Sequence, residues 1–255
     1  MKTYYGSLCA WFYDIDKPFA PKEELDFYLS YAHRGMSILE PMCGSGRFLV
    51  GFANRGFYVD GFDLSSDMIE RCKSKIRTSG IGVGKLECCD FSAFTTDKLY
   101  DCIYIAAYSF SLFIDSGEIL SRLKQMKDLL RPGGKILMGV LTDLNYRNGA
   151  TETDTLRSAR EDDIEITLES KSSYDRVKSV TYSQMTYRLL MNDEFIRAEN
   201  EDFYVKYYRP NELEKLVSVS GLQIEDSFAG FSKTAFLGQD TEAVIYVMSR
   251  GDNAE

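Results

Sequence analysis

The chain has 255 residues, of which 44% are hydrophobic and 27% are charged. This length can form one large or two small domains, and the composition is that of an ordinary globular protein. The formal net charge of −9 gives no basic footprint for nucleic acid or an anionic membrane surface. No apolar run approaches the roughly 20 residues that a membrane span needs, and the first residues lack the apolar segment of a signal peptide. We therefore expect a cytoplasmic protein without nucleic-acid or membrane partners.

The six cysteines predict reduced core thiols rather than a metal site. No two of them have the CxxC spacing, and His33 is the single histidine. The chain therefore lacks the usual set of zinc ligands, and we expect no metal. Cys43, Cys88 and Cys102 fall in or beside apolar runs, where a free cysteine behaves as a small buried hydrophobe. A nucleophilic site with a catalytic histidine would have to be built around His33, which lies in a polar segment.

In chain order, residues 1–20 are rich in aromatic side chains and are expected to be irregular. A helix then begins at Pro21. From residue 36, short apolar runs alternate with helical patterns, and the expected segments are strands near 36–41, 58–63, 83–88, 101–107 and 135–141, with helices near 46–55, 65–78 and 117–130. Apolar strands separated by amphipathic helices predict a parallel sheet covered on both faces.

The pattern changes after residue 142. Residues 143–163 are polar and predict a loop, and the stretches 164–168, 179–187 and 203–208 alternate as antiparallel strands do. We interpret 143–208 as an inserted antiparallel sheet that serves as a lid, a substrate region or a dimer interface. It separates an N-terminal cap and α/β core (1–142) from a return to the core (209–255) with a last helix and two strands.

The most informative motif is a glycine turn between a strand and a helix. Gly44 and Gly46 are two members of a GxGxxG pattern with Leu49 at its third position, which by itself fits a simple tight turn equally well. Glu40 lies four residues before Gly44, where its carboxylate would repel the pyrophosphate of a dinucleotide. An acid at this place suits a ligand with an ammonium group and no phosphate, such as S-adenosylmethionine.

Four segments resemble the class I S-adenosylmethionine-dependent methyltransferases. Residues 39–46 resemble motif I, 61–69 the motif that follows it, Cys89-Asp90-Phe91 motif II, and 130–135 the signature before the fifth strand. They occur in the family's order and spacing over about residues 36–141. The resemblance implies an α/β enzyme, Rossmann-like and doubly wound, with a mostly parallel seven-stranded sheet and S-adenosyl-L-methionine as its cofactor.

The resemblance also implies roles for individual residues. Glu40 would order the methionine ammonium group, and the backbone at Met42, Gly44 and Gly46 would line the methionine portion. Asp63 stands at the tip of the second strand, where an acid can accept both ribose hydroxyls.

At the adenine, Leu64 and Met68 would enclose the ring, although Met68 fits plain helix core as well. Cys89, Asp90 and Phe91 also count as cofactor-binding, with Asp90 accepting from the exocyclic amine. Ala106 would pass closest to the sulfonium. Tyr13 would reach the cofactor carboxylate, or it would act as an aromatic staple.

The acceptor is predicted less sharply than the donor. A sulfonium is already activated, so methyl transfer needs alignment more than a dedicated base, and we assign no catalytic residue. Tyr108, Ser109 and Ser111 are the polar candidates for the substrate, and their alternative role is loop polarity. We expect transfer to N or O of a small molecule by a monomer or homodimer. The alternatives are a sensor or pseudoenzyme that binds S-adenosylmethionine without methyl transfer, and a nicotinamide-dependent oxidoreductase.

Overall fold

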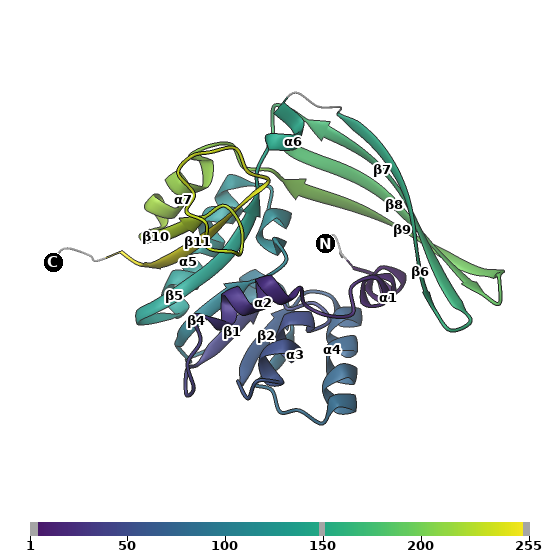
Figure 1. Ribbon diagram of the computed structural model, residues 1–255, viewed down its shortest axis with the longest axis horizontal. Coiled ribbons are helices and arrows are strands. Elements are labelled where there is room, and N and C mark those ends of the chain that lie inside the picture. The colour runs from purple at the N-terminus through teal and green to yellow at the C-terminus, as the bar shows by residue number, and fades with distance from the viewer. Residues whose placement is uncertain (1–4, 148–150, 252–255) are drawn as a thin grey trace.

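Two β-sheets organise the chain, which a computed structural model describes over residues 5–147 and 151–251 (Figure 1). The larger sheet has seven strands in the order β10-β11-β5-β4-β1-β2-β3. Its described strands pair in parallel except β11, which runs antiparallel to β5 and β10. The smaller sheet has four antiparallel strands in the order β6-β7-β8-β9. This architecture confirms the predicted Rossmann-like fold with an inserted antiparallel sheet.

The elements of the larger sheet and its covering helices follow the predicted alternation. The strands are β1 (Ile38–Pro41), β2 (Val59–Asp63), β3 (Leu86–Cys88), β4 (Tyr100–Ile105), β5 (Leu130–Leu141), β10 (Leu222–Phe228) and β11 (Ala243–Arg250). The helices are α2 (Lys22–Leu29), α3 (Arg47–Ala53), α4 (Ser66–Ser79), α5 (Ser116–Leu129) and α7 (Glu212–Ser220), with short turns η1 (Phe91–Ala93) and η2 (Ser109–Leu112). None of the helices in the described ranges is long and apolar enough to cross a membrane.

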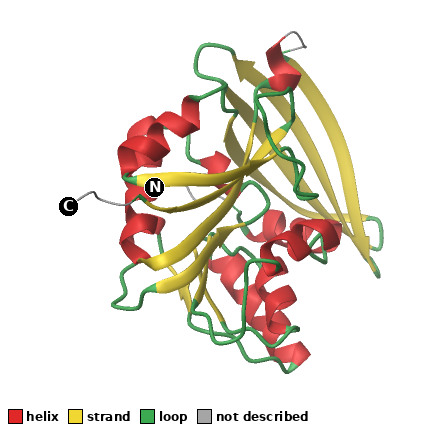
Figure 2. Ribbon diagram, turned by 60° about the vertical axis from the view of Figure 1, so that its left-hand side comes forward, coloured by secondary structure: helices red, strands yellow, loops and turns green. Residues whose placement is uncertain are grey.

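The side chains of the parallel strands alternate between two hydrophobic cores, one on each face of the sheet. In β4, Ile103 and Ile105 belong to the core under α5 and α7. Cys102 and Tyr104 belong to the core under α2, α3 and α4. Helices therefore cover both faces of the larger sheet, and the smaller sheet stands to one side (Figure 2).

The boundary between α5 and β5 differs from the prediction. We expected the helix to run to residue 130 and the strand to begin at 135. The helix ends at Leu129, and β5 already pairs with Tyr100 at Leu130 before an irregularity that leads to the pair Cys102 and Lys135. Gly133 has a φ of +78°. The Pro-Gly-Gly segment thus interrupts the register of the strand without ending it.

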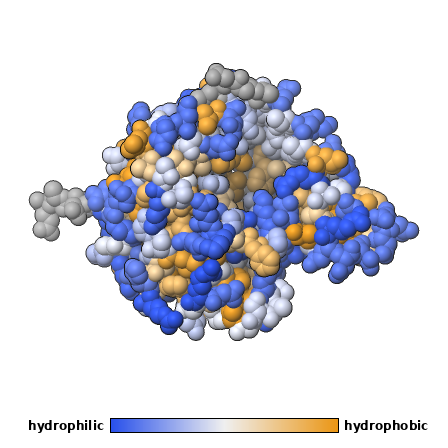
Figure 3. Space-filling view, in the orientation of Figure 1, coloured by the Kyte–Doolittle hydropathy of each residue, from blue (hydrophilic) through white to orange (hydrophobic). Residues whose placement is uncertain are grey.

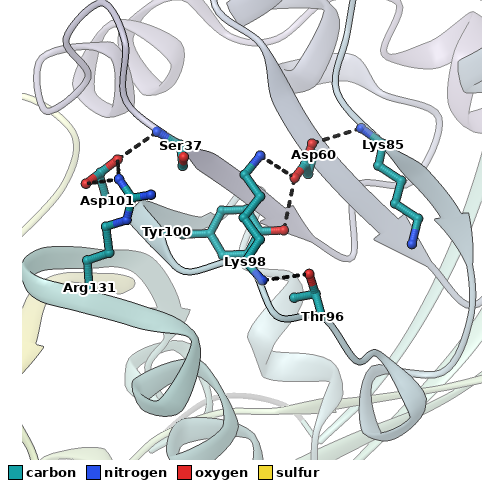
Figure 4. A network of polar contacts seen from close by, with 8 residues as sticks. All are labelled: Ser37, Asp60, Lys85, Thr96, Lys98, Tyr100, Asp101 and Arg131. Atoms are coloured by element: carbon teal, nitrogen blue, oxygen red, sulfur yellow. Dashed lines mark hydrogen bonds and ion pairs between the residues drawn. The ribbon is translucent and has the colours of Figure 1, made fainter.

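A polar network occupies the amino ends of the parallel strands (Figure 4). Asp60 of β2 accepts from Tyr100 Oη at 3.0 Å and from Lys98 Nζ at 2.8 Å. Asp101 of β4 accepts from the backbone N–H of Ser37 at 2.7 Å. These carboxylates have structural partners, so the opposite, carboxyl ends of the strands are the ones free to form a binding site.

The smaller sheet is longer than predicted. Its strands are β6 (Glu152–Glu161), β7 (Ile164–Asp175), β8 (Val180–Met191) and β9 (Glu194–Lys206), and a short helix, α6 (Leu144–Arg147), precedes them. The predicted loop over 143–163 is therefore wrong. Ala159 is the one buried residue of β6, so this edge strand lacks the alternation by which a half-buried strand is identified.

The prediction of an irregular N-terminus is also wrong, because α1 spans Ser7–Asp16. Leu8, Cys9 and Phe12 of this helix pack against β7 and β8, and together they form a third hydrophobic core. Aromatic residues have only moderate helix propensity, and tertiary packing is what stabilises α1.

One cysteine prediction needs correction. Cys43 and Cys102 are buried as expected, but Cys88 is exposed. The reason is the position of β3, which is the edge strand of the larger sheet and leaves part of its surface uncovered.

Candidate active site

A cavity of about 300 Å³ opens at the carboxyl ends of β1, β2 and β4. The strand order reverses between β1 and β4, and open α/β sheets bind ligands at such a point. Figure 3 shows apolar side chains gathered in the hollow between the core and the smaller sheet. The cavity volume lies within the range of small-molecule sites.

The turn between β1 and α3 brings bare backbone to the cavity. Met42, Gly44 and Gly46 have φ values of +58°, +53° and +77°. Met42 and Gly44 line the cavity, and a Cβ added at Gly44 would meet only Met68 Sδ, at 3.9 Å. The turn therefore leaves room for a ligand to approach its main chain.

Glu40 places a carboxylate in the cavity wall where β1 ends. The residue is 2% exposed, and its Oε2 accepts from Tyr104 Oη at 2.8 Å. Burial raises the pKa of Glu40 to about 8, although the Tyr104 hydroxyl and the charge of Arg47 act in the opposite direction. A ligand ammonium group beside Glu40 would favour its ionised form.

Asp63, at the end of β2, is fixed by two backbone donors. Its Oδ2 accepts from Gly44 N at 2.8 Å and its Oδ1 from Ser65 N at 2.9 Å. Burial raises the pKa of Asp63, and these N–H groups oppose the rise. Ser65 Oγ accepts from Met68 N and so caps α4. The carboxylate of Asp63 can accept further hydrogen bonds from a ligand in the cavity.

Beyond Asp63 the cavity runs between α4 and η1 and becomes apolar. Leu64, Met68 and Phe91 line this part. Asp90 accepts from Ser92 N at 2.7 Å, and its hydrogen bonds with Ser92 lower the pKa of Asp90. A flat heterocycle suits the apolar walls, with the carboxylate of Asp90 at its edge.

Arg47, to which we assigned no role from the sequence, adds a positive charge to the same cavity. Its Cζ lies 5.3 Å from the ring centre of Tyr13 and 5.0 Å from that of Phe48. Its Nε is buried and has no hydrogen-bond partner. Arg47 and Glu40 together can bind the two charged ends of an amino acid. The sequence signal for it was its place at the first position of α3, directly after the glycine turn.

Most of the predicted site residues come together in this cavity. The predicted cofactor residues that line it are Tyr13, Glu40, Met42, Gly44, Asp63, Leu64, Met68, Cys89, Asp90, Phe91 and Ala106, and the predicted substrate residue that lines it is Ser109. The lining residues without a predicted role include Tyr5, Arg47, Phe48, Leu112, Phe113, Ile114 and Glu118. Their contacts with a ligand stay a prediction.

Gly46 was predicted to line the cofactor, but it does not belong to the cavity wall. Its N–H donates to Cys43 O at 2.9 Å, within the turn. A Cβ at Gly46 would overlap Cys72 Sγ of α4. Close packing of the turn against α4 is thus the physical reason for glycine at this position.

Tyr108 and Ser111, two of the predicted substrate residues, also lie outside the wall. The ring of Tyr108 packs 5.9 Å from that of Phe231. Ser111 is 1% exposed, and its hydroxyl accepts from Leu141 N at 3.2 Å. Both side chains turn into the protein because η2 folds the segment back onto β5.

The wall after β4 is held from outside by α2. Ala107 and Tyr108 both have left-handed backbone conformations, with φ values of +54° and +57°. The carboxylate of Glu24, which is buried, accepts from Ala107 N at 2.7 Å. This contact fixes the strained turn that places Ala106, Ala107 and Ser109 on the cavity.

In sequence, the chain is similar to proteins described as methyltransferases. Residues 38–134 match the family model described as a methyltransferase domain. The chain is also 23% identical over 198 residues to the candidate methyltransferase YqeM of Bacillus subtilis (strain 168), and the match covers 77% of each protein.

Solved structures share the fold over nearly the whole chain. An S-adenosylmethionine-dependent methyltransferase from Clostridium acetobutylicum ATCC 824 superimposes with a TM-score of 0.78 at 19% identity, covering 95% of this chain and 97% of that one. The sugar N-methyltransferase KedS8 from Streptoalloteichus sp ATCC 53650 gives a TM-score of 0.75 at 14% identity, covering 99% and 98%.

Proposed function

We propose that this chain is a class I S-adenosylmethionine-dependent methyltransferase that transfers the methyl group to a nitrogen or oxygen atom of a small molecule. The observation that carries the proposal is one small cavity with two different ends. Two ionisable groups, Glu40 and Arg47, stand near the glycine turn. The wall after β4 is mostly apolar and borders the same space.

The residues of the cavity fit S-adenosylmethionine. The buried Nε of Arg47 lacks a partner, as expected of a donor that waits for a carboxylate. Glu40 would hold the ammonium group and Asp63 the ribose hydroxyls. The space beside Gly44, which a Cβ would partly fill, lets the backbone approach the methionine portion. Leu64 and Met68 would enclose the adenine.

The chain's own residues would bind and orient the cofactor and the acceptor, and they would exclude water from the cavity. The cofactor supplies a methyl group on a sulfonium, which needs no further activation by the protein. Tyr13 and Tyr5 shield the charged end of the cavity, and Phe113 and Leu112 border its other end. No histidine lies among the described residues that line the cavity, so an acceptor that is nucleophilic at neutral pH suits this site.

Nitrogen is favoured over oxygen by two considerations. Glu118 lines the cavity beside the apolar wall, and its carboxylate can accept a hydrogen bond from an amine whose pKa is near neutral. The structurally similar KedS8 is a sugar N-methyltransferase by its name, and a related acceptor chemistry is compatible with this cavity.

The wider organisation is part of the same proposal. Residues 1–142 would form the N-terminal cap and cofactor-binding core, 143–208 an inserted lid, substrate or dimer region, and 209–255 the return to the core. We further infer a cytoplasmic enzyme, monomeric or homodimeric.

The test is turnover with a panel of small amines and alcohols. The purified protein is incubated with S-adenosylmethionine and each acceptor, and S-adenosylhomocysteine and the methylated product are measured. An N- or O-methylated product that Asp63→Ala fails to form supports the proposal. Tight binding of S-adenosylmethionine without product from any acceptor would favour the sensor instead, and a C-methylated product would contradict the acceptor assignment.

A further inference from the structure

The amino end of α1 has no cap of its own. Gly6 occupies the N-cap position and has no side chain to accept a hydrogen bond, and the first turn of the helix contains no acidic residue. The free N–H groups at a helix start need acceptors, and the helix dipole favours negative charge there. Both must come from elsewhere in the molecule.

They come from β9 of the inserted sheet. Glu199 accepts from Leu8 N at 2.8 Å and from Ser7 Oγ at 2.7 Å. Glu201 accepts from the N–H of Gly6. Two carboxylates nearly 200 residues away in the sequence thus cap α1.

The side chains of β9 alternate, so the two carboxylates share one face of the strand. Phe203, the next residue on that face, packs edge to face against Tyr5 at 5.1 Å between ring centres. Asp202 points to the other face, where it accepts from Tyr182 Oη at 3.0 Å. On the same strand, Glu199 and Glu201 therefore contact the start of α1, whereas Asp202 points away from it.

The segment that these carboxylates hold forms part of the cavity. Tyr5 and Tyr13, just before and within α1, both line it. The carbonyl of Tyr5 accepts at 2.7 Å from the Oγ of Ser65, two residues after Asp63. Further along α1, Asp14 pairs with Lys75 Nζ at 2.7 Å.

We propose that Glu199 and Glu201 are positioning residues for donor binding, acting through α1 to hold Tyr5 and Tyr13 on the cofactor cavity. The inserted sheet then has a role at the donor site as well as any role toward the acceptor. This inference rests on the proposed function only in taking S-adenosylhomocysteine as a ligand of the cavity.

Trp11 offers a direct reporter, since it is the single tryptophan of the chain and lies on α1, with its ring 5.5 Å from Arg71 Cζ of α4. The experiment compares the wild-type chain with Glu199→Ala/Glu201→Ala and with Asp202→Ala as the matched control. For each protein, the emission maximum of Trp11, its quenching by acrylamide and the Kd for S-adenosylhomocysteine are measured.

In the double variant we expect red-shifted emission, stronger quenching and a Kd raised by about tenfold, because the segment that carries Tyr5 and Tyr13 loses the acceptors that hold the start of α1. Asp202→Ala should match the wild type in all three. Unchanged Trp11 emission and unchanged Kd in the double variant would overturn the proposal, as would an equal change in Asp202→Ala.

The conservative variant Glu199→Gln/Glu201→Gln keeps oxygen acceptors and tests the case in which the alanine variant does not fold. Its Kd should lie between those of the wild type and the alanine variant, and KM for S-adenosylmethionine should rise with little change in kcat. A fall in kcat at constant KM would contradict a role in donor binding. Failure of the wild type itself to bind S-adenosylhomocysteine would instead sink the proposed function.

Discussion

The proposed chemical role of Glu40 follows from its place in the sequence, and its pKa follows from its neighbours in the tertiary structure. Its place before the glycine turn predicts an ammonium site from the sequence. The tertiary structure adds Tyr104, whose hydroxyl donates to Glu40, and the burial that raises the pKa of Glu40 to about 8. The ligand-free protein therefore holds this carboxyl largely protonated near neutral pH.

The raised pKa predicts a pH-dependent stability. In the unfolded chain the pKa of Glu40 is about 4.5, so between about pH 4.5 and 8 the folded state binds more protons than the unfolded state. The stabilising contribution is complete below pH 4.5 and is lost as the pH rises through 8. Glu40→Gln should accordingly gain more free energy of unfolding, relative to wild type, at pH 9 than at pH 5, as measured by urea denaturation.

Tyr104→Phe provides the complementary variant. It removes a donor that lowers the pKa of Glu40, so its loss of stability between pH 5 and 9 should be steeper than that of the wild type. Equal pH dependence in the wild type and Glu40→Gln would show that Glu40 titrates normally.

At the scale of elements, the turn between β1 and α3 contains two glycines with different structural reasons. The sequence identifies the turn, but it assigns Gly44 and Gly46 the same role. The structure separates them: Gly44 faces the cavity and Gly46 faces Cys72 of α4. The difference arises because α4 is placed by tertiary packing, which the local sequence does not describe.

This difference predicts unequal costs of substitution. Gly46→Ala must introduce a methyl group against Cys72 Sγ at a φ of +77°, and it should lower the free energy of unfolding by more than the about 1–2 kcal/mol expected for left-handed strain alone. Gly44→Ala should show only that strain. Chemical denaturation measures both.

A double-mutant cycle with Cys72→Ala tests the assigned cause. Removing the sulfur should recover part of the loss in Gly46→Ala and none in Gly44→Ala. Additive losses in the Gly46 cycle would mean that the backbone conformation, and not the contact, sets the cost.

The whole molecule contains separate hydrophobic cores, and α1 belongs to the core of the inserted sheet. Phe12, which is buried, packs with its ring centre 5.8 Å from that of Tyr187 on β8. The cores under the larger sheet contain neither residue. A loss of packing in one core should therefore first lower the local stability of the sheet to which that core belongs.

Phe12→Ala should cost about 3–5 kcal/mol locally and reduce hydrogen-exchange protection in β7 and β8 while β1 and β4 remain protected. Phe52→Ala, in the core of the larger sheet where Phe52 stacks 4.7 Å from Tyr104, should produce the reverse pattern. Equal loss of protection in both sheets for either variant would show that the two sheets unfold as one unit.

The sequence by itself determined the α/β core and predicted the donor, because local features encode both. Apolar strands, a glycine turn and acids at strand tips such as Glu40 and Asp63 are read within a few residues. Only the tertiary structure decided the parts that depend on distant contacts. β6 is an exposed edge strand without a pattern, α1 is stabilised by the inserted sheet, and Glu199 reaches the start of α1 across most of the chain. Packing and hydrogen bonds between distant parts of the chain place these groups, so a local sequence pattern cannot predict their positions.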